Sequence, residues 1–268
     1  MRLVRPVCIT LLSVFVIGLL INSCSDTSTG PGNGGEPEPD PYSHTDQPGS
    51  AANDILADSN FTELVVEIDY MPGYEPDAEA LDSLEAFLER RAHKEVTIMD
   101  PTEIESGGQD SYTDEEVRDL EEEHRDEFTE NEDSETLAAY MIIVDGEFEE
   151  DSETTDVLGI AYYNTSNAFF GPKYDEVEDS GTSRYKVEST SYRHEFGHLF
   201  GLVNIDGSGT DMQENHQDEE HGHHCDNDEC LMYYAMERSD VFEQILGDEN
   251  VPELDQNCIN DLQGNGGR

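Results

Sequence analysis

The sequence has little positive charge. It contains 13 lysine and arginine residues against 64 aspartates and glutamates, so its formal net charge is −51 at pH 7. Proteins that bind nucleic acid need a basic patch to neutralise phosphates. The composition therefore excludes nucleic acid as an expected partner.

Lysine is especially scarce, because Lys94, Lys173 and Lys186 are the only lysines in the chain. A strong acid excess with so little lysine resembles the composition of proteins from salt-loving organisms. At molar salt the Debye length falls to about 3 Å, which screens the self-repulsion that otherwise destabilises a compact state. We therefore expect a halophilic, salt-adapted surface rather than a specific acidic partner.

Long apolar runs are also scarce, and the clearest one lies near the N-terminus, from Val7 to Ile21. It is short for a membrane span and typical of a signal-peptide core. It ends in INSC, which resembles the cleavage site of bacterial lipoproteins. We expect a signal peptide over 1–23 and an exported cell-envelope lipoprotein, periplasmic or surface-facing, anchored to a membrane through Cys24. An ordinary signal peptide or an uncleaved anchor is the alternative.

Residues 24–52 contain little that could form a core. Glycine, proline, serine and aspartate dominate this stretch, as they do in flexible tethers. The remaining residues, 53–268, suffice for one domain with a real core. Within it, residues 205–223 are rich in glycine and acidic residues, and we expect them to form an inserted loop.

Apolar periodicity along the domain alternates between strands and helices. Strands are expected over 61–71, 95–100, 136–148 and 157–171, the last as one strand or as a hairpin that turns near 164–167. Asp77 and Thr113 are good N-caps for two helices, one reaching Leu88 and one reaching Phe128. A short strand is then expected to lead into a helix around residue 194. This order predicts an α/β or α+β fold with a sheet layer.

The sequence YRHEFGHLFGLVN, residues 192–204, carries the clearest chemistry. His194 and His198 are four residues apart, so on a helix their imidazoles share one face and can hold one metal ion. Glu195 would point near the ion and take a proton from a metal-bound water. Gly201 can end the helix and turn the chain back. A catalytic zinc needs three protein ligands, so one ligand must come from elsewhere.

This stretch resembles the metzincin clan of zinc metalloproteases, whose motif HExxHxxGxxH/D precedes a methionine turn. The match holds through Gly201 and fails at Asn204, since an amide is a poor zinc ligand. Further on, His224 is followed by C-x4-C-x-M, which is similar to the archaemetzincins. The resemblance implies His224 as third ligand and Met232 as the Met-turn residue. It also implies a mixed, mostly parallel twisted sheet, an active-site helix and a short irregular C-terminal subdomain.

The inserted loop offers competing ligands. His216 is the first alternative to His224, and His221 is the second. With His223, these residues otherwise belong to a solvated loop or to a second metal site.

Three cysteines remain after the signal peptide and the lipidated residue, namely Cys225, Cys230 and Cys258. The archaemetzincin pattern has a later C-x-x-C that completes a four-cysteine zinc site, but here Asp261 replaces the last cysteine. We therefore expect one disulfide among the three thiols rather than a second structural zinc, with the pairing open.

The sequence thus predicts a membrane-tethered zinc metalloendopeptidase that hydrolyses peptide bonds, with Glu195 as general base toward a zinc-bound water. By resemblance to metzincins, a peptide substrate would add to the strand over 158–163. Tyr234, two residues after Met232, would stabilise the transition state, or else serve only in packing. The alternative is a catalytically inactive zinc-binding or adhesion lipoprotein with the same fold. The sequence leaves substrate preference and oligomeric state open.

Overall fold

The computed structural model describes residues 41–149, 156–240, 242 and 250–268. The predicted signal peptide, Cys24 and most of the predicted tether lie outside these residues. Among the helices that are described, none is both long and apolar enough to cross a bilayer. The chain from Pro39 to Arg268 folds as one unit.

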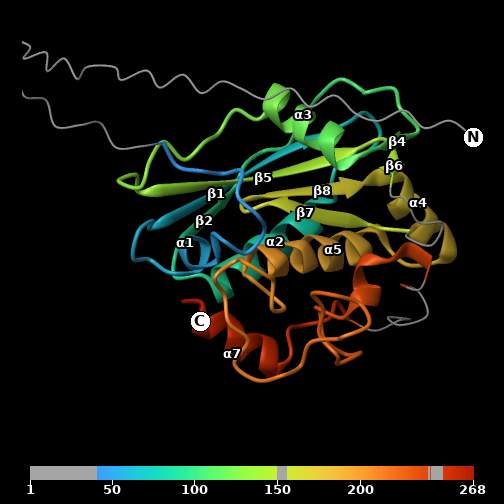
Figure 1. Ribbon diagram of the computed structural model, residues 1–268. Coiled ribbons are helices and arrows are strands. Elements are labelled where there is room, and N and C mark those ends of the chain that lie inside the picture. Colours follow the sequence, from blue (N-terminus) through green and yellow to red (C-terminus); the bar gives the residue numbers. More distant parts are fainter. Residues whose placement is uncertain (1–40, 150–155, 241, 243–249) are drawn as a thin grey trace, which may run out of the picture. The chain divides into compact units, whose positions relative to one another are not determined.

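A mixed sheet of six described strands organises this unit (Figure 1). Its order is β2-β1-β5-β8-β7, with β3 also paired to β1. Every pairing is parallel except that of β7 with β8. The strands are β1 (Glu63–Tyr70), β2 (Glu95–Ile98), β3 (Thr102–Glu103), β5 (Thr136–Val144), β7 (Gly159–Tyr163) and β8 (Ser166–Phe170). This confirms the predicted mixed, mostly parallel fold, and it places β7 at one edge.

Strand β5 lies at the centre because its residues are apolar on both faces. Leu137, Ala139 and Met141 point into one buried cluster, whereas Tyr140 and Ile142 point into another on the opposite face, as the two-residue period of a strand requires. A small second sheet joins β4 (Ser111–Tyr112) to β6 (Glu147–Phe148).

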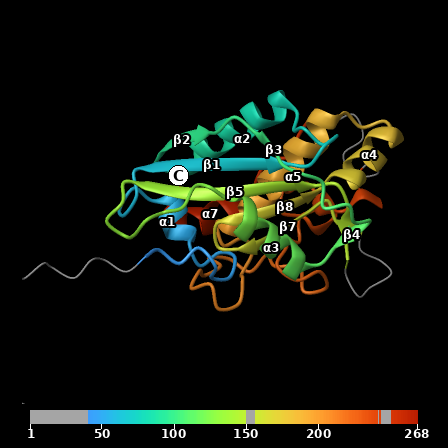
Figure 2. The same cartoon turned by 90° about the horizontal axis from the view of Figure 1, so that it is seen from above.

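Helices cover both faces of the large sheet. Figure 1 shows α2 (Ala78–Arg91) and α5 (Arg184–Leu199) on one face and α3 (Asp114–His124) on the other, and Figure 2 shows the same arrangement from above. The predicted caps are confirmed, since Asp77 accepts from an N–H of α2 and Thr113 forms a capping box with Glu116. The remaining described helices are α1 (Ala52–Leu56), α4 (Gly171–Ser180), α7 (Gln256–Gly264) and the 3₁₀ helix η1 (Tyr234–Glu237).

One sequence prediction differs from the structure, and two helices were not predicted. Helix α5 begins at Arg184, so no short strand precedes it. The hairpin prediction for 157–171 is confirmed by β7 and β8. Helices α4 and α7 were not predicted, because Gly171 and Pro172 at the start of α4 and the glycines after α7 indicate turns when they are considered without their neighbours.

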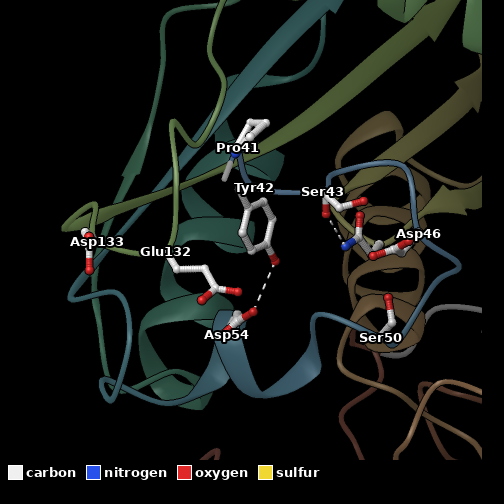
Figure 3. Close-up of a pocket in the computed structure, with 9 residues that line it drawn as sticks. Pro41, Tyr42, Ser43, Asp46, Ser50, Asp54, Glu132 and Asp133 are labelled. Carbon is white, nitrogen blue, oxygen red and sulfur yellow. Dashed lines mark hydrogen bonds between the residues drawn. The ribbon is translucent and has the colours of Figure 1, made fainter. Parts of the chain in front are cut away.

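The folded unit also begins earlier than the boundary predicted at residue 52. The Tyr42 ring packs edge-on against Phe61 at 5.5 Å, and the Tyr42 hydroxyl donates to Asp54 at 3.2 Å (Figure 3). Figure 3 shows Tyr42 and Asp54 in a pocket that Asp46 and Glu132 also line. The volume of this pocket is about 520 Å³. Residues 41–52 therefore belong to the domain, which a composition typical of tethers does not indicate.

Candidate metal centre

Helix α5 presents His194 and His198 on one face. Nδ1 of His194 donates to the Leu231 carbonyl oxygen at 2.7 Å, and Nδ1 of His198 donates to the Leu202 carbonyl oxygen at 2.8 Å. A carbonyl can only accept, so Nδ1 of each ring carries a proton, and in the neutral ring Nε2 keeps the electron pair that can bind a metal. Gly201, at φ 84°, ends the helix as predicted.

The third imidazole at this face belongs to His224. Its Nδ1 donates to the His221 carbonyl oxygen at 2.6 Å, which fixes the same tautomer. The ring centroids of His194 and His198 lie 4.9 Å apart, and those of His224 lie 5.3 and 5.2 Å from them. The three rings therefore form a nearly equilateral triangle around one point.

Two atoms of this triangle have no partner of their own. Within the described part of the chain, Nε2 of His194 and Nε2 of His224 are buried and make no hydrogen bond of good geometry. A buried polar atom without a partner is costly, and three imidazoles with free Nε2 atoms are a donor set that zinc prefers. Burial lowers the pKa of His198 well below its usual range, and a positive charge on His194 or His224 would lower it further. His198 is therefore neutral, as metal binding requires.

Glu195 lies beside this triangle, between α5 and the edge strand β7. The backbone N–H of Ala161 donates to its carboxylate, and burial, followed by the charge of Glu237, raises the pKa of Glu195 well above its usual range. Its Oε1 atom is buried without a hydrogen-bond partner. A buried carboxylate with an unpaired oxygen beside the triangle suits a general base.

A second carboxylate, that of Glu237, also reaches the triangle. Its Oε2 lies 3.2 Å from Nε2 of His224 and 3.6 Å from Nε2 of His194. Burial alone would raise the pKa of Glu237, but His224 and His194 outweigh burial and lower it. The sequence prediction missed this residue. Its position depends on the path of the chain after η1, and no local motif marks that path.

Met232 lies under the metal-binding face of α5. Met232 is fully buried, and a Cβ atom on Gly197 would overlap its sulfur atom. Glycine at this position therefore lets the methionine approach the helix backbone between the two histidines. The role of Met232 as a Met-turn residue stays a prediction.

The other predicted candidates lie elsewhere. The His221 ring stacks on the Tyr234 ring at 3.6 Å, which places Tyr234 against the inserted loop. His223 donates to the Asn204 carbonyl oxygen at 3.0 Å, and the Asn204 amide donates to Gln217. Of the four histidines between 216 and 224, only His224 joins the triangle.

A cleft of about 550 Å³ opens beside the triangle. Strand β7 forms one wall through Gly159, Ile160 and Ala161, and the inserted loop forms the opposite wall. Glu195 and Glu237 both line the cleft. An extended segment entering it would therefore lie beside the outer edge of β7.

A second donor cluster surrounds His216. Its Nδ1 lies 3.4 Å from Cys225 Sγ, and its Nε2 pairs with Asp261 at 2.7 Å. Cys230 Sγ lies 3.6 Å from Cys258 Sγ. For comparison, two sulfur atoms on one tetrahedral zinc lie about 3.8 Å apart.

Cys230 has the environment of a metal-binding thiolate. The thiols of Cys225 and Cys258, with backbone N–H groups, lower the pKa of Cys230 to about 4. We expected a disulfide among these residues, but the structure has all three as free thiols. His216 lies beside them as a further possible donor, with its Nδ1 3.4 Å from Cys225 Sγ. Asp261, where the resemblance leads one to expect a cysteine, holds that histidine in place instead.

Comparison with solved structures finds the same fold. The chain is similar to an archaemetzincin from Methanopyrus kandleri, with a TM-score of 0.50 and 15% sequence identity over 77% of this chain and 96% of that one. A zinc-dependent peptidase from Methanocorpusculum labreanum has a TM-score of 0.47 and 17% identity over 74% of this chain and 99% of that one. No protein-family model and no curated protein matches the sequence. The similarity to the archaemetzincin shows an archaemetzincin-like fold.

Proposed function

We propose that this chain is a zinc-dependent endopeptidase, exported and tethered through Cys24 as the sequence predicts. The observation that carries the proposal is the triangle of His194, His198 and His224, whose free Nε2 atoms converge beside the buried Glu195. The fold is shared with an archaemetzincin, which supports the proposal. Palmitate labelling that disappears in Cys24→Ser tests the tether.

The three histidines would hold the zinc, and the carbonyl groups behind them keep each ring oriented. When bound, the zinc would lower the pKa of a water molecule toward about 7 and polarise the scissile carbonyl. Glu195 takes a proton from that water and then passes it to the leaving amine. Its raised proton affinity favours the first transfer.

Strand β7 would align the substrate. Among the described strands it pairs only with β8, so backbone groups on its outer side can pair with a peptide that enters the cleft. Ala161 belongs to this strand and also holds Glu195. A peptide added to β7 would therefore be placed in register with the general base.

Hydrolysis of a denatured protein by the full chain, in molar salt, tests this proposal. We expect cleavage that a chelator abolishes and that added zinc restores, because three imidazoles with an open fourth position are the donor set of a catalytic zinc. Molar salt is needed because the net charge of −51 opposes folding at low ionic strength. If no chelator-sensitive cleavage occurs while zinc is bound, the alternative of an inactive zinc-binding or adhesion lipoprotein holds.

The thiol cluster supports a second proposal, namely a structural zinc. The donor atoms of His216, Cys225, Asp255 and Cys258 lie within 4.8 Å of one another, and Cys230 Sγ lies 3.6 Å from Cys258 Sγ. Cys258→Ser should lower the bound zinc from about two ions per chain to about one, since a structural site needs four ligands. Zinc is counted by elemental analysis of the purified chain. His221→Ala, in an exposed part of the same loop, is the control and should keep both ions. An unchanged zinc count in Cys258→Ser would contradict this assignment.

A further inference from the structure

The centre described above has four donors rather than three. The donor atoms of His194, His198, His224 and Glu237 all lie within 4.8 Å of one another. A catalytic zinc keeps its fourth position open, whereas a closed site has four protein ligands. The position of Glu237 therefore decides whether the fourth position of the metal centre is open in this conformation.

The distances from Glu237 are those between ligands of one ion. Donor atoms bound to a tetrahedral zinc at about 2.0 Å lie about 3.3 Å from each other. Oε2 of Glu237 lies 3.2 Å from Nε2 of His224 and 3.6 Å from Nε2 of His194. One carboxylate oxygen thus lies at ligand spacing from two imidazoles at once.

Hydrogen bonding does not account for this arrangement. Among the described residues, Nε2 of His194 and Nε2 of His224 make no hydrogen bond of good geometry, although both are buried and Glu237 is near. The proton of each ring is on the other nitrogen, where it is donated to a backbone carbonyl. One cation placed between Oε2 of Glu237 and these two nitrogen atoms could be bound by all three.

The backbone of Glu237 is fixed against the start of the edge strand. Its carbonyl oxygen accepts from the Leu158 N–H at 2.7 Å, and the next residue, Arg238, forms an antiparallel bridge with Val157. The Ser239 N–H continues this pairing by donating to Asp156 at 2.8 Å. Residues 237–239 thus pair with residues 156–158, just before β7. This pairing directs the Glu237 carboxylate toward the metal centre.

We propose that Glu237 is a fourth, displaceable ligand of the metal centre, so that the resting chain is closed and a substrate must displace this carboxylate. The inference rests on the proposed metal centre and deepens it. The Glu237 side chain is 23% exposed, whereas that of His194 is 0% exposed. The carboxylate can therefore leave toward the cleft while the histidines stay in place.

Displacing the Glu237 carboxylate lowers the apparent affinity of substrates and inhibitors alike. If the closed arrangement is populated about ten to one, the apparent affinity of any ligand for the fourth position is about tenfold weaker than its intrinsic affinity. Removing the carboxylate removes this competition. Glu195 takes no part in it, because its carboxylate is held by Ala161.

Metal binding by the full chain tests the proposal without any need for hydrolysis. Glu237→Gln keeps the shape of the side chain, and Glu237→Asp keeps the charge but shortens the reach. Both should weaken zinc at the catalytic centre at least about tenfold in competition with a chelator, and both should change the visible spectrum of the cobalt-substituted protein. Glu229→Gln, which removes an exposed acid nearby, is the control and should change neither. Wild-type zinc affinity and cobalt spectrum in both Glu237 variants would overturn the proposal.

Binding of acetohydroxamate, a small zinc ligand, gives an independent readout. It should bind Glu237→Gln about tenfold more tightly than wild type, and any peptide hydrolysis by this variant should rise. A loss of hydrolysis with unchanged zinc and acetohydroxamate affinity would instead make Glu237 an acid or base, and would overturn the proposal. If no variant hydrolyses peptides, the proposed peptidase function fails, and the metal and acetohydroxamate results still decide the role of Glu237.

Discussion

Glu195→Gln is expected to lower the rate of peptide hydrolysis about 10³-fold while zinc remains bound. Glutamine keeps the size of the side chain and can still pack between α5 and β7, but it cannot accept the proton from water. General-base catalysis contributes about 10²–10⁴-fold to such reactions. The measurement is kcat for cleavage of a denatured protein, with zinc content determined on the same sample.

The fate of zinc in this variant separates catalysis from folding. Glu195 is not one of the donors that surround the triangle, so the zinc content should equal that of wild type. Glu178→Gln removes an exposed acid on α4, the helix that precedes α5, and should leave the rate of hydrolysis unchanged. Hydrolysis at the wild-type rate by Glu195→Gln would show that another residue is the base.

His224→Ala is expected to weaken zinc at the catalytic centre more than about 100-fold, since losing even an outer-shell partner costs about 10–100-fold. The neighbouring substitution His223→Ala is a matched control. His223 donates to the Asn204 carbonyl oxygen and lies outside the donor set, so its loss should change affinity little. Competition with a chelator measures both variants.

A folding defect must be distinguished from a lost ligand in this experiment. His224→Asn separates these two causes, because its side-chain amide can still donate to the His221 carbonyl oxygen in place of Nδ1. This variant should keep the wild-type circular dichroism spectrum and still lose zinc. If His224→Asn binds zinc as wild type does while His216→Ala does not, then His216 is the third ligand.

The parts of the site that lie on α5 could be predicted because their signals are local. A four-residue spacing sets His194 and His198 on one face whatever the rest of the chain does. Gly201 marks the end of the helix for an equally local reason, its positive φ. The central strand β5 was recognisable from its unbroken apolar run.

Other parts depend on segments that meet only in the folded chain. Glu237 reaches the centre because its backbone pairs with residues about 80 positions earlier. The position of His216 beside Asp261 and Cys225 could not be predicted either, since its pairing with Asp261 spans 45 residues. Neither contact has a period or a spacing that a single sequence displays.

The most direct test of the zinc-peptidase assignment is anomalous X-ray scattering at the zinc edge from crystals of the zinc-loaded chain. We predict a strong peak bounded by the Nε2 atoms of His194, His198 and His224, with Glu195 beside it. An empty triangle, or a peak held by His216, His221 and His223 in its place, would contradict the assignment.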